Sequence, residues 1–302
     1  MREELTLDTS NQLSRHLSYQ DTTHRVYFRD SRQMKEVKDE EVHLVVTSPP
    51  YWNIKDYGNP KQIGYRDSLQ EYMRKLGEVW SECVRVLNKG CRLCINIGDQ
   101  YLRATEKTPY QIIPLHALLV NSIMDHHSEE VLYLGSIIWN KISTTKTSGG
   151  ASVMGSYGYP RNGYVSYNYE YIAIFKKKGE APNPPPEIKE KAQIDLSEWR
   201  ELFTGIWSFK GARQIGGIAI FPDILPSRLM RMFTYEGDTV LDPFLGSGTT
   251  TRIAWELGRN SIGYEIGFQS PDIENWKEAI KEKIHFNDTP IYERSKVFPT
   301  LT

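Results

Sequence analysis

Residues 239–257 combine a short apolar strand, a glycine-rich turn and a helix, and this succession limits the folds open to the chain. Residues 239–241 favour a buried strand, and Gly246-Ser247-Gly248 follows shortly after it. Glycines at such a turn let the backbone bend tightly and let a ligand approach closely. A helix is predicted from 249 to 257, with Gly258 as its end. Strand, open turn and helix in this order predict an α/β domain.

The rest of the chain alternates between apolar runs that predict strands and amphipathic segments that predict helices. Further strands are expected at residues 42–46, 91–97, 132–139, 169–175 and 261–265. Helices are expected at residues 68–87, 110–124, about 225–233 and 274–284. Ser68 and Glu71 form a capping box at the start of the first helix, and Lys89-Gly90 is its expected end. The alternation predicts a doubly wound, mostly parallel sheet of the α/β class.

Charge is balanced over the whole chain but not locally. Lysine and arginine number 37 and aspartate and glutamate 38, and the formal net charge of −1 argues weakly against a protein that binds nucleic acid. Between Trp139 and Lys178, however, six basic residues accompany one acidic residue, Glu170. This stretch falls in two irregular segments, about 141–168 and 176–215, which we interpret as insertions on the sheet. Their positive charge can face phosphates, and a solvated loop is the plain alternative.

Cysteine, histidine and apolar patterns argue against several other classes of protein. Cys91 and Cys94 have the spacing of a metal-binding pair, but no second pair accompanies them. The seven histidines show no ligand spacing either, so no metal is expected. The low, odd number of cysteines predicts a reduced, cytoplasmic setting. No apolar run approaches the ~18 residues of a membrane span, and the charged N-terminus lacks the apolar core of a signal peptide.

The glycine-rich turn predicts a site for a nucleoside cofactor. A P-loop would need a lysine after Gly248, and a dinucleotide fingerprint would need a third glycine at Thr251, and neither is present. S-adenosylmethionine needs no phosphate cradle, and its charged amino-acid part suits Asp242. Glu265 follows Asp242 by 23 residues, at the end of the next predicted strand, where an acid can bind ribose hydroxyls. An ordinary strand-to-helix turn is the structural alternative.

A second segment, Thr47-Ser-Pro-Pro-Tyr-Trp52, follows the predicted strand at 42–46. Its prolines cannot continue a strand, so it lies past the carboxyl end of that strand, where open α/β sheets bind ligands. There the Ser48 hydroxyl and the Pro49 carbonyl can accept hydrogen bonds from an exocyclic amine. The two aromatic residues that follow can stack on a planar base. A loop-breaking Ser-Pro-Pro beside a surface Tyr-Trp pair is the alternative interpretation.

Together these segments resemble those of the β-class DNA amino-methyltransferases of restriction-modification systems. In that class the catalytic segment comes first, a target-recognition region follows, and the cofactor segment comes last. Ser48-Pro-Pro-Tyr51 and Asp242–Thr250 have this order here. Arg29-Asp30-Ser31 resembles the segment whose acid contacts the adenine of the cofactor, and Phe221-Pro222 resembles an element on the cofactor side. The resemblance covers roughly residues 25–285.

The resemblance implies a Rossmann-like methyltransferase fold with an inserted target-recognition region and S-adenosylmethionine as cofactor. It divides the chain into a polar arm (1–23), a catalytic half (24–140), recognition insertions with one core strand near 169–175 (141–215) and a cofactor-binding half (216–302). The residues expected to hold the base are Ser48, Pro49, Pro50, Tyr51 and Trp52. Those expected to bind the cofactor are Asp30, Ser31, Phe221, Asp242, Pro243, Phe244, Gly246, Ser247, Gly248, Thr249 and Glu265. The candidates for DNA contact are Lys141, Lys146, Arg161 and Lys176.

The first residue of the catalytic motif indicates the target base. Within the family, Ser-Pro-Pro-Tyr is typical of cytosine-N4 enzymes and Asp-Pro-Pro-Tyr of adenine-N6 enzymes, so Ser48 favours N4 of a cytosine flipped out of duplex DNA. An adenine-N6 enzyme is the nearest alternative, followed by a catalytically silent DNA-binding module and a methylator of RNA or protein. Cytosine-C5 methylation is rejected because none of the three cysteines follows a proline. The recognised DNA sequence, a cognate restriction endonuclease, and the choice between monomer and homodimer stay open.

Overall fold

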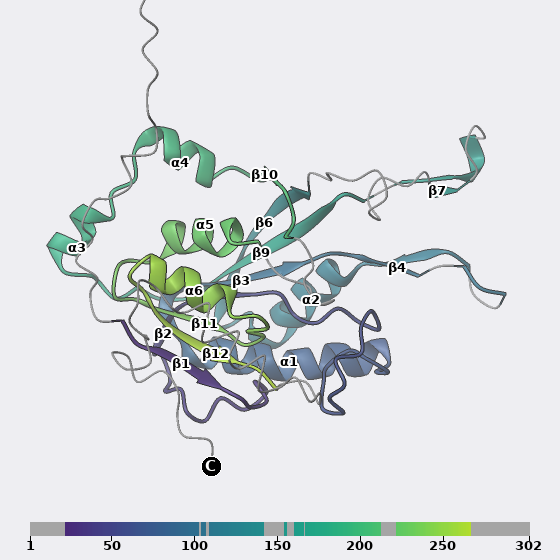
Figure 1. Cartoon of the computed structure of the whole chain (residues 1–302), viewed down its shortest axis with the longest axis horizontal. Helices are drawn as coiled ribbons and strands as arrows, with labels where there is room; N and C mark the ends of the chain where they lie inside the picture. The colour runs from purple at the N-terminus through teal and green to yellow at the C-terminus, as the bar shows by residue number, and fades with distance from the viewer. Residues whose placement is uncertain are drawn as a thin grey trace, which may run out of the picture.

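The computed structural model describes residues 22–102, 104–106, 109–141, 154–155, 160–165, 167–212 and 222–266. The helix expected at 274–284 and nearly all of the N-terminal arm lie outside these ranges. Within them, helices pack on both faces of an eight-stranded sheet, as Figure 1 shows. This arrangement confirms the doubly wound, mostly parallel α/β architecture that the alternation of strands and helices predicts.

The central sheet has the strand order β1-β12-β11-β2-β3-β9-β6-β10. Its strands are β1 (His24–Tyr27), β2 (Val42–Thr47), β3 (Leu87–Ile97), β6 (Val131–Lys141), β9 (Tyr169–Lys177), β10 (Ile206–Phe209), β11 (Thr239–Asp242) and β12 (Asn260–Tyr264). Neighbours run parallel, except that β9 is antiparallel to both β3 and β6. β11 lies beside β2, with Val240 opposite Leu44. The strands that precede the two predicted motifs are therefore neighbours in the centre of the sheet.

Two pairs of helices cover the two faces of this sheet (Figure 1). They are α1 (Leu69–Val86) with α2 (Leu115–His127), and α5 (Ile224–Phe233) with α6 (Thr249–Glu256). Trp80 of α1 is fully buried in one core, and Leu229 of α5 is fully buried in the other. Because side chains alternate along a strand, Val45 and Val46 of β2 belong to different cores. The central strands are thus buried on both faces, so only the residues at their ends can contact a ligand.

The first long helix begins as predicted but ends earlier. Ser68 caps α1, and its hydroxyl accepts a hydrogen bond from the Glu71 N–H at 3.1 Å. Lys89-Gly90 does not end the helix, because both residues lie in β3. Gly90 has a φ of 75°, and a Cβ there would lie 2.2 Å from the backbone nitrogen of Ala181. Glycine is therefore needed for the close approach of a neighbouring segment, which the sequence pattern does not reveal.

Part of the expected recognition insertion belongs to the sheet itself. β10 lies within residues 176–215, pairs parallel with β6 and buries Trp207. The same segment carries α3 (Pro186–Lys191) and α4 (Leu196–Leu202). The interpretation of all of 176–215 as an insertion is therefore wrong for β10, whose four residues show too short an alternation to stand out in the sequence. A role of the remainder in target recognition stays a prediction.

Short elements complete the described fold. β4 (Gln100–Leu102) pairs with β5 (Gln111–Ile113), and β7 (Met154–Gly155) pairs with β8 (Gly163–Tyr164). A 3₁₀ turn at Pro160–Asn162 directly precedes β8. In Figure 1, β4 and β7 lie to the same side of the sheet. α2 begins at Leu115 and not near residue 110, because residues 111–113 form β5 and Pro114 precedes the first turn.

Candidate active site

A cavity of about 450 Å³ lies at the carboxyl ends of the central strands. Residues that follow β2, β11 and β12 line it, among them Ser48, Phe244 and Glu265. The two predicted motifs, about 190 residues apart in the sequence, therefore share one cavity. This is the edge at which open α/β sheets bind ligands.

The glycine-rich turn has a conformation that its glycines permit. Gly246 has a φ of 53° and Gly248 a φ of 80°, both in the left-handed region. The Gly246 N–H donates a hydrogen bond to Oε2 of Glu265 at 2.9 Å, so the acid after β12 is fixed against the turn. Gly246 and Glu265 both line the cavity. The predicted pairing of turn and acid is thus present in space.

Asp242 lies behind the cavity and is not among the residues that line it. Its buried carboxylate accepts hydrogen bonds from Thr47 Oγ1 at 2.8 Å, Thr250 Oγ1 at 2.6 Å and the Phe244 N–H at 3.0 Å. These donors come from both motifs, so Asp242 ties the catalytic segment to the glycine-rich turn. This placement does not support the expected direct contact between Asp242 and the cofactor.

We expect Asp242→Asn to change how the stability of the fold depends on pH. Burial raises the pKa of Asp242 to about 6, although its three hydrogen bonds act in the opposite direction. The folded state therefore holds the proton more tightly than the unfolded chain, and stability is lost as the pH rises from about 4 to about 6. A shift of about 2 pKa units corresponds to about 3 kcal/mol. Asparagine has no charge to bury and keeps an oxygen for the Phe244 N–H.

Urea unfolding at about pH 4 and about pH 7 tests this expectation. The free energy of unfolding of Asp242→Asn, relative to that of the unchanged protein, should rise between the two pH values by up to about 3 kcal/mol. Asp125→Asn, at an exposed position on α2, is the control and should show no such rise. If Asp242→Asn and the unchanged protein followed the same pH dependence, Asp242 would not titrate in this range.

The Ser-Pro-Pro-Tyr motif forms the other side of the cavity, and all four of its residues line it. The Tyr51 hydroxyl donates a hydrogen bond to the Glu170 carboxylate and accepts from the Ser48 hydroxyl and the Gly98 N–H. Burial, followed by the negative charge of Glu170, raises the pKa of Tyr51 well above its usual value. The phenol therefore stays protonated, and Ser48, Tyr51 and Glu170 belong to one hydrogen-bonded group, in which Asn96 Nδ2 also donates to Ser48 Oγ at 3.5 Å.

Glu170 and Asn96 form a buried polar corner that the sequence analysis did not identify as a site. Only 8% of Glu170 and 4% of Asn96 is exposed, and both line the cavity. Asn96 Nδ2 donates to Glu170 Oε2 at 2.8 Å, and the Lys141 ammonium group pairs with Oε1. Asn96 Oδ1 has no hydrogen-bond partner among the described residues. A buried acceptor in this state needs an explanation, and a donor on a bound ligand supplies one.

The order of the strands explains why these three side chains meet. Asn96 is on β3, Glu170 on β9 and Lys141 on β6, and these strands are neighbours in the sheet. The available signal was that Glu170 is the one acid within a basic stretch. The antiparallel course of β9 brings its first residues to the carboxyl end of β3, and the sequence pattern did not predict that direction.

The structure brings together most of the residues predicted to bind the cofactor. Those that line the cavity are Asp30, Ser31, Pro243, Phe244, Gly246 and Glu265. Ser247, Gly248 and Thr249 form the turn and the start of α6 without lining the cavity, and Phe221 lies outside the described residues. Burial raises the pKa of Asp30, but hydrogen bonds from Arg32 outweigh burial and lower it. Asp30 is therefore a carboxylate at the cavity wall, held by Arg32 Nε at 3.0 Å.

The predicted DNA contacts are scattered. Lys141 lines the cavity beside Glu170. Lys176 lies opposite Arg92, in the middle of β3, toward the end of β9 that is farther from the cavity, so its position does not support contact with DNA at the site. Arg161 is exposed in the 3₁₀ turn, and Lys146 lies outside the described residues. Trp52 does not line the cavity either, since its Nε1 donates to the Asp67 carbonyl at 2.8 Å.

The cofactor side of the cavity fits a nucleoside. Glu265 offers a carboxylate for ribose hydroxyls, Phe244 and Ile63 offer apolar surface for a base, and Asp30 offers a second acceptor. In the described ranges, no group of three or more His, Cys, Asp or Glu residues is arranged to hold a metal ion. No helix in the same ranges is long and apolar enough to cross a membrane.

Fold and cavity together define a Rossmann-like methyltransferase domain. The family described as DNA methylase matches residues 42–273, and the chain belongs to this family of N6 and N4 methyltransferases. The resemblance carried by the two motifs is thereby confirmed at the level of the amino-methyltransferases of restriction-modification systems. Assignment to the β-class stays a prediction.

Individual relatives agree with the family. The chain is 36% identical over 295 residues to the Type II methyltransferase M.MjaI of Methanocaldococcus jannaschii, covering 87% of this chain and 93% of the relative. It is 35% identical to the Type II methyltransferase M.MthZI of Methanothermobacter thermautotrophicus, covering 87% and 77%. The structure of TTHA0409 from Thermus thermophilus complexed with S-adenosyl-L-methionine is 29% identical, with a TM-score of 0.68 and coverage of 87% and 95%. The PvuII cytosine-N4-specific DNA methyltransferase shares the fold, at 19% identity, a TM-score of 0.62 and coverage of 90% and 91%.

Proposed function

We propose that this protein transfers a methyl group from S-adenosylmethionine to the exocyclic N4 of a cytosine flipped out of duplex DNA. The observation that carries the proposal is the shared cavity, which Ser48 lines on one side and the glycine-rich turn on the other. Membership of the DNA methylase family supports methylation of an exocyclic amine. Because that family includes both N4 and N6 chemistry, the choice of cytosine rests on Ser48 at the head of the motif.

The residues around Ser48 suit an amine that is a poor nucleophile. The lone pair of a cytosine or adenine amine is delocalised into the ring, and acceptors for its two hydrogens favour a pyramidal, more reactive nitrogen. Ser48 is hydrogen-bonded to Tyr51, and its oxygen accepts from Asn96 Nδ2 at 3.5 Å. A hydroxyl oxygen has two lone pairs, so one is left to accept from the amine. Asn96 Oδ1 is a second acceptor without a partner among the described residues. The Pro49 carbonyl is a third group that can accept at this wall.

The other wall of the cavity suits the cofactor. S-adenosylmethionine, when bound, supplies a methyl group on a sulfonium. Glu265 accepts from the ribose hydroxyls, Phe244 packs on the adenine, and Asp30 accepts from the adenine amine. The S-adenosyl-L-methionine complex of TTHA0409, which shares this fold at 29% identity, supports the assignment.

An amine in the stack of a duplex cannot reach a cavity of this kind, so the nucleotide must leave the helix. Burial of Asn96 and Glu170 makes the polar corner effective only for a base that enters the cavity. Tyr51 lines the cavity and can stack on the base. A cognate restriction endonuclease is the partner that the Type II relatives suggest.

Identification of the product tests the proposal. The protein is incubated with S-adenosylmethionine and duplex DNA of varied sequence, and the digested nucleosides are identified by mass spectrometry. We expect N4-methyldeoxycytidine, and none in a control without protein. N6-methyldeoxyadenosine would leave the cofactor site in place and overturn the use of Ser48. No methylated nucleoside would favour a silent DNA-binding module or a substrate among RNA and proteins.

A further inference from the structure

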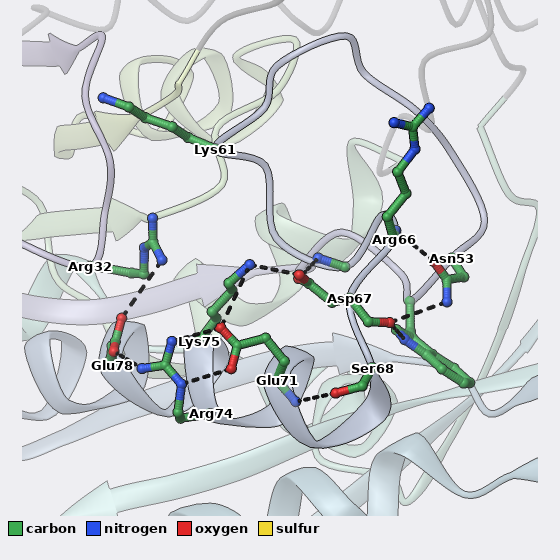
Figure 2. Close-up of polar contacts among 12 residues, drawn as sticks. Arg32, Asn53, Lys61, Arg66, Asp67, Ser68, Glu71, Arg74, Lys75 and Glu78 are labelled. Carbon is green, nitrogen blue, oxygen red and sulfur yellow. Dashed lines mark hydrogen bonds and ion pairs between the residues drawn. The ribbon is translucent and has the colours of Figure 1, made fainter.

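The loop after the catalytic motif, residues 52–67, carries positive charge at the cavity. Lys55 and Lys61 line the cavity, and Arg66 is exposed further along the loop. In Figure 2 the Lys61 side chain points to the left and the Arg66 side chain points upward, and both lie above α1. The loop therefore presents cations at the cavity and on the surface beside it.

The cations around this loop fall into two groups. Lys75 pairs with the Asp67 carboxylate at 2.6 Å, and Arg74 pairs with two glutamates of its own helix. Lys61 and Arg66 form no ion pair with any residue that the structure describes, and no dashed line reaches either charged group in Figure 2. The Arg66 guanidinium lies over the Tyr65 ring at 5.2 Å, and the charge of Lys61 lowers the pKa of Asp30. Without an ion pair of their own, both cations can still bind a negatively charged partner.

Arg66 also has a backbone conformation that arginine rarely adopts. Its φ is 64°, in the left-handed region, which costs a residue with a Cβ roughly 1 kcal/mol. The Arg66 N–H donates to Asn53 Oδ1 at 2.8 Å, which holds this conformation in place. Glycine would adopt it without cost. A strained residue of this kind is a reason to look for a use of its side chain.

The rest of the loop is firmly anchored. Trp52 Nε1 donates to the Asp67 carbonyl at 2.8 Å, and the Gly64 N–H donates to the Asp67 carboxylate at 2.8 Å. The Asn53 N–H donates to the Gly64 carbonyl at 3.0 Å. These bonds join the loop directly to the segment that carries Ser48. The two cations, Lys61 and Arg66, therefore extend from a backbone that is fixed relative to the reacting amine.

We propose that residues 52–67 form a docking surface for the DNA backbone, on which Lys61 and Arg66 bind phosphates beside the flipped nucleotide. The inference rests on the proposed function, because it needs duplex DNA as the substrate. The formal net charge of the chain is −1, so DNA must be attracted by a local surface. The loop also carries a negative charge at Asp56, whose carboxylate accepts a hydrogen bond from the Gly58 N–H at 2.8 Å within the loop. This surface differs from the basic stretch at 139–178, where the sequence places the DNA contacts.

The salt dependence of DNA binding tests the inference. The Kd for a duplex of random sequence is measured by fluorescence anisotropy between about 50 and about 200 mM salt, for the full chain and for Lys61→Gln, Arg66→Gln and their combination. Removal of each phosphate-binding cation should reduce the steepness of log K against log salt by about 0.9, so the double variant should show a reduction of about 1.8. Arg74→Gln is the matched control, since it removes one exposed charge that is already paired.

The outcomes separate the inference from the proposed function. Unchanged steepness in the double variant, or an equal reduction in Arg74→Gln, would overturn the docking surface while DNA binding itself persists. Absence of any duplex binding by the unchanged protein would overturn both together. Arg66→Gly adds a readout that a purely structural arginine would not give, because it should raise the Tm by relieving the backbone and still weaken DNA binding. A fall in the Tm with unchanged DNA affinity would also contradict the inference.

Discussion

Replacement of Ser48 by alanine should lower the turnover number about 100-fold, while the Kd of S-adenosylmethionine changes by less than about twofold. The Ser48 hydroxyl lines the cavity and is hydrogen-bonded to Tyr51, and under the proposed function its oxygen accepts from the amine that attacks the methyl group. Removal of that acceptor affects the reacting nitrogen and leaves Glu265 and the glycine-rich turn untouched. Transfer of labelled methyl groups to DNA measures turnover, and isothermal titration measures the Kd.

The control for this variant is Ser68→Ala, which removes another serine hydroxyl that does not line the cavity. Ser68 caps α1, so its loss should cost about 1 kcal/mol of stability and leave turnover unchanged. A loss of cofactor binding in Ser48→Ala would show that the two walls of the cavity do not have separate roles. Unchanged turnover would remove Ser48 from the reaction altogether.

The fold and both motifs were accessible from sequence because their signals are local. Buried strands such as residues 239–241 are followed within a few residues by glycines or prolines that cannot continue them. Parallel strands bring such ends to one edge of a sheet, so two motifs at opposite ends of the chain could be placed in one site. The acid Glu265 was found in the same way, from its position after the next strand.

The polar corner could not be found by this route, because it depends on the order and direction of strands. Asn96, Glu170 and Lys141 meet only because β9 runs antiparallel between β3 and β6. Asp242 shows the reverse case, in which a residue of the cofactor motif points away from the cavity toward Thr47 and Thr250. Local patterns locate a segment at the site, whereas the direction of each side chain is decided by packing between segments.

Replacement of Glu265 by alanine should raise the Kd of S-adenosylmethionine about 100-fold, which is about 2.7 kcal/mol, and leave turnover at saturating cofactor nearly unchanged. Hydrogen bonds to a charged acceptor contribute about 1.5–3 kcal/mol each, and under the proposed function the Glu265 carboxylate accepts them from the ribose hydroxyls. The Gly246 N–H would also lose its acceptor at 2.9 Å, so the turn would lose a hydrogen bond that fixes its shape. Isothermal titration of the full chain with the cofactor measures the effect.

Two further variants separate a specific effect of the Glu265 carboxylate from a general effect of removing one negative charge from the protein. Glu265→Gln keeps an oxygen for the Gly246 N–H but can accept less from the ribose, so its Kd should rise only about tenfold. Glu256→Gln on α6 removes a carboxylate that pairs with Arg252, and its Kd should stay within about twofold. Equal Kd values for Glu265→Ala and the unchanged protein would reject the ribose assignment. A large fall in turnover at saturating cofactor would place Glu265 on the base side of the cavity. Gly246, which donates to Glu265, would then belong to that side as well.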